Sequence, residues 1–158
     1  MTSANNLDLL GKVARIFNPP ASYGQILQDL AAKDPDVCAI VEAAIEVHTT
    51  LGHGFLVPVY CQALAVELSA RSVAFEPKAQ ITLNYKDHLL NTGYEADFIC
   101  YGDMLVLATA AAQLERTHDR QLVSHLKCTG LRRGLYLNFG VERVDFHRAM
   151  APRREGPA

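Results

Sequence analysis

The spacing of the apolar residues changes near residue 79, and this change limits the folds that the chain can adopt. Before it, apolar residues recur every three or four positions, which predicts helices at about residues 34–51 and 57–70. Asp34 suits the N-cap of the first of these helices, and Gly52 suits its end. In the second helix the apolar stripe consists of Val59, Ala63, Val66 and Ala70, widened by Leu64 and Leu68.

After this point the pattern favours strands. Residues 79–85 alternate between apolar and polar types, as a half-buried strand does. Further strands are predicted at residues 94–101, 104–108 and 135–139, and the continuous apolar run at 104–108 predicts a strand buried on both faces. Turns are predicted at 86–88 and 102–103, and one helix at 115–128 that ends at Gly130. Helices, three antiparallel strands, a helix and a strand together predict an α/β fold with a small mixed β-sheet flanked by helices.

The length and composition predict a single folded domain. The chain has 158 residues, of which 49% are hydrophobic and 20% charged, which is a globular composition. We expect the domain at residues 34–150, after an N-terminal helical extension (1–33) and before a flexible tail (151–158). In the extension, helical spacing at residues 9–17 and 22–32 is interrupted by Asn18-Pro19-Pro20.

Charge is distributed unevenly. Residues 1–113 hold 6 basic and 12 acidic residues, a net charge of −6, whereas residues 114–158 hold 9 basic and 5 acidic residues, a net charge of +4. An anionic partner would therefore meet the C-terminal third first. The alternative is that these arginines are solvated surface residues, as most charge runs are.

The four cysteines give no sign of a metal site or of a disulfide framework. They stand at positions 38, 61, 100 and 128, without a CxxC pair or zinc-like spacing with histidine. Because the chain also has no signal-peptide pattern and no run of about 18 apolar residues, we expect reduced thiols, a cytoplasmic location and no membrane contact.

Several short strings in a fixed order resemble one family, the small bacterial and archaeal GxxExxY proteins, which are placed among the PD-(D/E)XK nuclease-like folds. The strings that carry this resemblance are Ala43-Ala44-Ile45-Glu46-Val47-His48, Leu51-Gly52-His53-Gly54, Tyr60, Ala63 to Leu68, Ala96-Asp97-Phe98, His118, Gln121, Leu126-Lys127, Thr129-Gly130-Leu131 and Gly134 to Gly140. The resemblance covers about residues 37–150 and implies a restriction-endonuclease-like core. It also implies nuclease chemistry, in which carboxylates on two adjacent strands hold Mg²⁺ and a lysine assists.

The chain departs from the family pattern at most of the positions that would carry this chemistry. Asp97 matches the metal-binding aspartate, and Gln121 matches the glutamine of the helix motif. The second-strand glutamate and lysine positions hold Leu107 and Thr109. A slip of one residue would place Ala108 and Ala110 there, with the same consequence. The glutamate of the family name falls on Val57, and the tyrosine that follows the glutamine falls on His125.

We therefore expect a catalytically degenerate nuclease-like protein, because one carboxylate supplies too few hard ligands for a specific Mg²⁺ site. It would bind DNA or RNA through Lys127, Arg132 and Arg133, or would serve as a protein-interaction module, in either case without a cofactor. The alternative is a weak nuclease dependent on Mg²⁺ or Mn²⁺, in which Asp97 and Gln121 act with a carboxylate from Glu95 or Asp103. The resemblance also leaves a homodimer open.

Other ionisable residues favour structural roles. His118, Gln121, His125 and Cys128 share one face of a predicted helix. However, the two histidines are about 10 Å apart along the helix, too far for one Zn²⁺. We expect His48 and His53 to be structural, Asn138 to satisfy a turn, and the cysteines to be buried apolar residues with no nucleophilic role.

Overall fold

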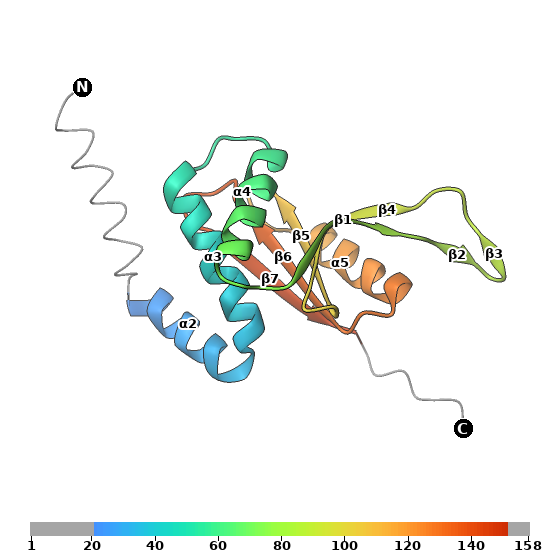
Figure 1. Cartoon of the computed structure of the whole chain (residues 1–158), viewed down its shortest axis with the longest axis horizontal. Helices are drawn as coiled ribbons and strands as arrows, with labels where there is room; N and C mark the ends of the chain where they lie inside the picture. Colours follow the sequence, from blue (N-terminus) through green and yellow to red (C-terminus); the bar gives the residue numbers. More distant parts are fainter. Residues whose placement is uncertain (1–20, 152–158) are drawn as a thin grey trace.

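A five-stranded sheet in the order β1-β4-β5-β6-β7 organises the part of the chain that the computed structural model describes, residues 21–151 (Figure 1). The β5–β6 pair is parallel and the other three neighbouring pairs are antiparallel, so the sheet is mixed. A second, two-stranded sheet pairs β2 with β3. The strands are β1 (Phe75–Ile81), β2 (Asn84–Tyr85), β3 (His88–Leu89), β4 (Tyr94–Cys100), β5 (Met104–Thr109), β6 (Arg133–Asn138) and β7 (Asp145–Met150).

The helices within residues 21–151 are α2 (Ala21–Lys33), α3 (Pro35–Leu51), α4 (Val57–Ala70) and α5 (Arg116–Thr129), and α2 packs on α3. The Asp34 side chain accepts a hydrogen bond from the amide of Val37 at 3.2 Å, which satisfies a free N–H group at the start of α3. Gly52 has a φ of +74° at the end of α3, and Gly130 has a φ of +71° at the end of α5. The predicted helix ends are therefore confirmed at these residues.

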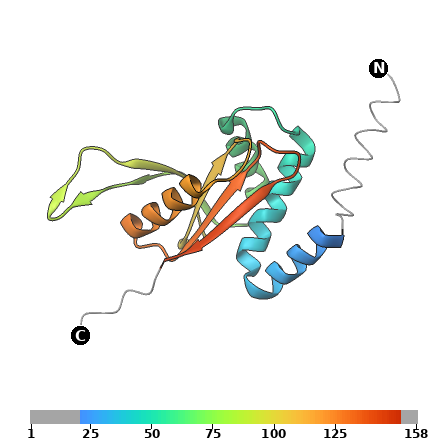
Figure 2. The same ribbon diagram turned by 180° about the vertical axis from the view of Figure 1, so that it is seen from behind.

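The helices cover opposite faces of the sheet, as Figures 1 and 2 show. On one face α3 and α4 pack against apolar residues that include Phe98, Val106 and Leu135. On the other face α5 packs against Leu105, Leu107 and Tyr136. The central strand β5 is thus buried on both sides, as its continuous apolar sequence predicted.

The distal part of the β1–β4 hairpin extends well away from the body of the molecule (Figures 1 and 2). We call residues 81–94, which include β2 and β3, the β-arm. Ile81 and Tyr94 form the pair at its base, and only two pairs, Asn84–Leu89 and Tyr85–His88, form the ladder at its tip.

The structure differs from the prediction in two strands and one helix. The strand predicted at residues 79–85 starts at Phe75 and is interrupted after Ile81, because Thr82 and Leu83 lie outside the ladders. Strand β7 was not predicted, since it is an edge strand with charged residues and has no apolar alternation. In α4 the covered face is that of Tyr60, Leu64 and Leu68, whereas Val59 and Val66 of the predicted stripe are exposed.

The structure tests only part of what was predicted for the two ends of the chain. The short helix predicted at residues 22–32 is confirmed by α2. The helical spacing at residues 9–17 and nearly all of the predicted tail lie outside the described residues. None of the helices in residues 21–151 is long and apolar enough to cross a membrane.

A cluster of charges joins α3 to the sheet. The guanidinium group of Arg133, at the start of β6, donates to Asp36 at 2.9 Å, to Asp34 at 3.2 Å and to Asp103 at 3.1 Å. These three carboxylates raise the pKa of Arg133. The Arg133 side chain is only 19% exposed. One arginine therefore ties the N-terminus of α3 and the turn before β5 to β6.

Replacing Arg133 tests this connection. Arg133→Ala should lower the free energy of unfolding by about 1.5–3 kcal/mol, because charge-assisted hydrogen bonds are lost and three acidic groups are left close together. The neighbouring Arg132 is exposed and has no ion pair among residues 21–151, so Arg132→Ala should change stability by less than about 0.5 kcal/mol. Urea unfolding followed by circular dichroism measures both values, and equal effects would contradict the proposed role.

Candidate functional site

Asp97 lies in β4 at the point where β4 and β5 stop pairing. The β4–β5 ladder runs from Cys100–Met104 to Phe98–Val106 and does not continue to the next residue. There the carboxylate of Asp97 accepts a hydrogen bond from the amide of Ala108 at 2.8 Å, and the thiol of Cys61 in α4 donates to its other oxygen at 3.7 Å. The protein itself therefore supplies partners for both carboxylate oxygens.

The surroundings of Asp97 disfavour its charged form. Burial raises its pKa, and the nearby charge of Glu95 adds to this effect, while the hydrogen bonds from Ala108 and Cys61 partly oppose it. Burial and the charge of Asp97 also raise the pKa of the Cys61 thiol to about 12. Burial raises the pKa of Cys100 to about 12 as well. Neither thiol is a nucleophile at neutral pH. Cys100 is buried as expected and Cys61 is half-buried, but Cys128 is exposed, so the expected burial is wrong for Cys128.

The positions that would carry the second carboxylate and the lysine lie on the opposite side of β5 from α4. Leu107 is 3% exposed, pairs with Tyr136 across the β5–β6 ladder and packs under α5. Thr109 pairs with Asn138 at the end of the same strand. Val57, at the first turn of α4, packs against the apolar core one helical turn before Cys61. Apolar side chains therefore occupy positions 57 and 107, and a neutral hydroxyl occupies position 109.

Gln121 is connected to this region through Tyr136. The phenol of Tyr136 in β6 donates a hydrogen bond to the side-chain oxygen of Gln121 in α5 at 3.0 Å. Burial raises the pKa of Tyr136, and the charge of Asp97 raises it further, which places Asp97 within electrostatic range of the phenol. The structure therefore brings Asp97 and Gln121 to the same region, with Tyr136 between them. Tyr136 belongs to the segment Gly134 to Gly140 that resembles the family, but the sequence did not indicate a role for it.

The sequence-based search also missed Lys78. The pairs Pro77–Phe98 and Ala79–Ala96 flank it, so Lys78 in β1 lies opposite Asp97 in β4. Its φ of +50° is unusual inside a strand, and its charge lowers the pKa of Cys61. The Pro77-Lys78 pair just before the predicted strand gave no signal, since proline argues against a strand interior.

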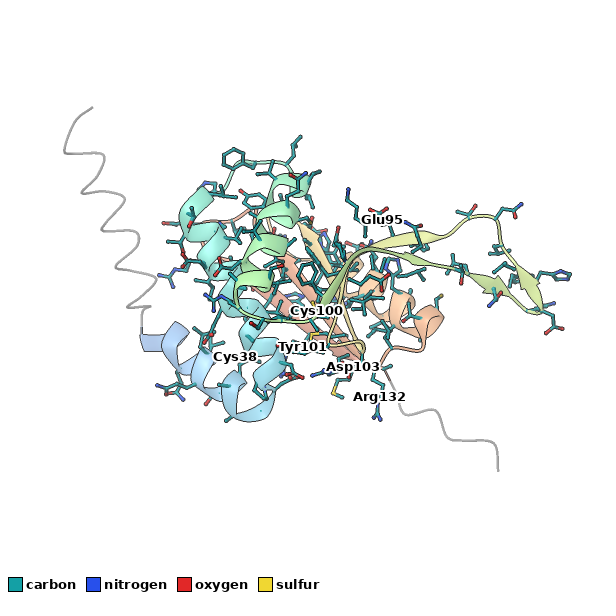
Figure 3. All side chains as sticks on the ribbon, viewed as in Figure 1. Cys38, Glu95, Cys100, Tyr101, Asp103 and Arg132 are labelled. Carbon is teal, nitrogen blue, oxygen red and sulfur yellow. The ribbon has the colours of Figure 1, made fainter. Side chains whose placement is uncertain are left out.

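The two candidates for a second carboxylate differ in position (Figure 3). Glu95 lies two residues before Asp97 on β4 and accepts a hydrogen bond from Gln80 at 3.0 Å. Asp103 lies at the other end of β5, where it pairs with Arg133. Because Asp97 contacts Ala108, five residues along the strand, Asp103 is about 16 Å away from this contact. The expectation that Asp103 completes the site is corrected by this placement.

The residues around Asp97 do not fit a divalent cation. Among residues 21–151 no three histidine, cysteine or acidic side chains lie close enough together to hold a metal ion. Asp97 has one acidic neighbour, Glu95, and burial raises the pKa of Asp97 itself, whereas Mg²⁺ and Mn²⁺ sites need several ionised or carbonyl oxygens. We derive no metal-dependent step from this geometry.

Most of the other singled-out polar residues have structural partners. His48 is buried and its Nε2 lies 2.8 Å from the carbonyl of Val141. The Asn138 side chain accepts from the amides of Ala111 and Gly140 and donates to the carbonyl of Ala111, so it satisfies a turn as expected. His118 accepts a hydrogen bond from the amide of Glu115 at 2.9 Å and thereby caps α5.

His125 differs from these residues. It is 4% exposed, and its Nδ1 is buried without a hydrogen-bond partner among residues 21–151. Its ring packs against Tyr94 at the base of the β-arm, with ring centroids 4.5 Å apart. Burial lowers the pKa of His125, so the neutral imidazole is the form that fits this place.

Exposed cations line the outer side of α5. Arg116, Arg120 and Lys127 are exposed and follow one another at steps of four and seven residues, which places them within about 40° around the helix axis. Arg132 is exposed just beyond α5 (Figure 3). Arg133, by contrast, is held by three carboxylates, so its predicted part in nucleic-acid binding does not fit its placement. Arg116 and Arg120 belong to the basic C-terminal third of the chain, but they were not among the residues predicted to bind nucleic acid.

The mixed sheet with a carboxylate where two strands diverge is a nuclease-like arrangement, and comparison with known proteins agrees. The sequence model of the PD-(D/E)XK nuclease superfamily matches residues 35–149, so the chain belongs to this superfamily. The fold is accordingly restriction-endonuclease-like.

A solved structure titled "Crystal structure of SSO0001" is similar to this chain, with 14% sequence identity and a TM-score of 0.49. The similarity covers 62% of this chain and 51% of that protein, so the chain spans about half of its length. No curated protein matches the sequence.

Two substitutions separate the acceptor role of Asp97 from its charge. Asp97→Asn should be at least as stable as the original protein at neutral pH, because an amide oxygen still accepts from Ala108 and no charge is buried. Asp97→Ala should lose about 1–3 kcal/mol, since the Ala108 amide loses its partner. Urea unfolding at neutral pH measures both, with the exposed Glu95→Gln as the control. Equal losses for Asn and Ala would show instead that the charge of Asp97 is needed.

The buried imidazole of His125 should make stability depend on pH. Its folded-state pKa is lowered, so between the unperturbed value of about 6.5 and the lowered value only the unfolded chain binds the proton. Stability should therefore fall as pH falls through this range, by up to about 1.4 kcal/mol per pH unit for this group. His125→Phe should make the dependence shallower in urea unfolding between about pH 7.5 and about pH 5.5. The pKa of His48 is lowered too, so some dependence should remain, and an unchanged slope would contradict the prediction.

Proposed function

We propose that this chain is a catalytically degenerate member of its superfamily, of the GxxExxY group, which binds nucleic acid without efficient cleavage of phosphodiesters. The proposed loss of catalysis rests mainly on the state of Asp97. Its carboxylate is half-buried, is satisfied by Ala108 and Cys61, and has a raised pKa. Because Leu107 lies in the core where the family has its glutamate, no second carboxylate from β5 joins it.

The row of cations on α5 supports nucleic-acid binding. Arg116, Arg120 and Lys127 have no ion-pair partner among residues 21–151, and Arg132 extends the row beyond the end of the helix. Phosphate groups along a nucleic-acid backbone are a regular series of anions that such a row would fit. The four free cysteines of the described chain suit a reducing compartment, so we place the protein in the cytoplasm.

Binding and cleavage can be tested in one set of measurements. Purified protein is mixed with labelled single- and double-stranded DNA and RNA, in EDTA and in Mn²⁺, and followed by anisotropy and by denaturing gels. We expect binding in EDTA, intact nucleic acid in Mn²⁺, and affinity that falls steeply with salt. Replacing Arg116, Arg120 and Lys127 with Gln should reduce the log–log salt slope on duplex DNA by about 2.7, or about 0.9 for each phosphate contact.

A lysine outside the basic row gives the control. Lys33, at the end of α2, is exposed, and Lys33→Gln should leave both affinity and salt slope unchanged. The binding proposal is contradicted by no binding to any of the four nucleic acids, or by an unchanged slope in the triple variant. Cutting in Mn²⁺ that disappears in Asp97→Ala and in Glu95→Gln would establish the weak nuclease instead, with Glu95 as the additional carboxylate.

A further inference from the structure

The exposed apolar side chains of this protein are concentrated in two places. Ten large hydrophobic residues are exposed in the described chain, and eight of them lie either at α4 or in the β-arm. At α4 they are Phe55, Leu56, Val59 and Val66, and in the β-arm they are Tyr85, Leu89, Leu90 and Tyr94. Single exposed apolar residues need no explanation, but clusters of this kind mark interaction surfaces.

The α4 surface is the outer side of a largely apolar helix, and the exposed Gln62 is the polar side chain that lies between Val59 and Val66. Leu56 and Val66 are 78% and 70% exposed, although the opposite side of the helix is fully covered. No charged residue occurs between His53 and Glu67, so this surface lacks the charged face expected of a helix that borders solvent. One apolar side of α4 is therefore buried in the protein, and the other is free to pack against a partner.

The β-arm has the same character. Leu89 and Tyr85 are 68% and 61% exposed, and within residues 21–151 the two strands at its tip pair with no third strand. A two-stranded ribbon of this kind is only marginally stable in water unless its apolar side chains are covered. The charges at its tip, Lys86 and Asp87, are of opposite sign, so they do not repel an uncharged surface.

The two surfaces cannot cover each other within one chain. Figures 1 and 2 show that the β-arm extends from the sheet away from α4, and both views agree on this separation. A partner that packs on one surface alone leaves the other exposed. A second copy of the chain, related by a two-fold axis, covers both at once, since the same pair of surfaces meets twice.

We propose that the protein forms a two-fold homodimer in which the β-arm of each protomer packs on the α4 surface of its partner. Each contact alone is small, but two copies of it, formed from four large apolar residues on each surface, increase the buried area toward that of a stable dimer. The basic side of α5 contributes to neither surface, so this inference is independent of the proposed nucleic-acid binding.

Sedimentation velocity on the full chain over a wide concentration range tests the dimer. The original protein should be a dimer, and Val66→Glu or Leu89→Glu should each raise the dimer dissociation constant at least about tenfold, because a charge would be buried in both contacts. Both residues are highly exposed, so folding should be unaffected. Ile26→Glu is the matched control, since Ile26 is an exposed apolar residue of α2 outside both surfaces.

Mixing the two variants identifies the arrangement. A heterodimer of Val66→Glu with Leu89→Glu has one unaltered contact, between the arm of the first protein and the α4 surface of the second. The mixture should therefore associate more tightly than either variant alone. A protein that is monomeric at every concentration, or dimers equally strong in all variants, would overturn the proposal. If the monomer bound nucleic acid and the same two variants weakened that binding, these surfaces would belong to the nucleic-acid interface.

Discussion

Burial of β5 on both faces is the constraint on which the rest of this structure depends. A strand covered on both sides cannot carry unpaired polar side chains, and its residues from Met104 to Ala108 are accordingly apolar. This strand pairs with β4 and β6, and α4 and α5 pack on its two sides. The position of Asp97 follows from it, because the carboxylate accepts the amide of Ala108 where the ladder with β4 ends.

The same constraint accounts for the absence of a second carboxylate from β5 beside Asp97. A glutamate at position 107 would have to be ionised in a place where Leu107 now packs between β6 and α5, and only a bound cation would offset that cost. With leucine there, the core is continuous and Asp97 is left with hydrogen bonds from the protein alone. Burial raises the pKa of Asp97, Cys61 contacts its carboxylate, and Tyr136 donates to Gln121, so these polar groups are satisfied within the protein.

Charge and apolar surface are separated on this molecule. The exposed cations lie along α5 on one face of the sheet, whereas the apolar surface of α4 lies on the other face and the β-arm extends beyond the sheet (Figures 1 and 2). The two proposals use these different surfaces. A two-fold dimer built through α4 and the β-arm would leave both α5 helices free, so two basic rows could contact one nucleic acid.

By itself, the sequence determined the class of fold, the limits of α3, α4 and α5 and the double burial of β5, since these follow from local periodicity and residue type. It also shows that positions 57, 107 and 109 hold residues without a charge. Only the tertiary structure decided which acidic and basic groups meet. Arg133 is a partner of Asp103 rather than a free cation, and Lys78 lies opposite Asp97. The exposed side of α4 was also decided there, because an apolar stripe does not show whether another element covers it. Strand register and helix packing join residues far apart in the chain, and local patterns carry no record of such pairs.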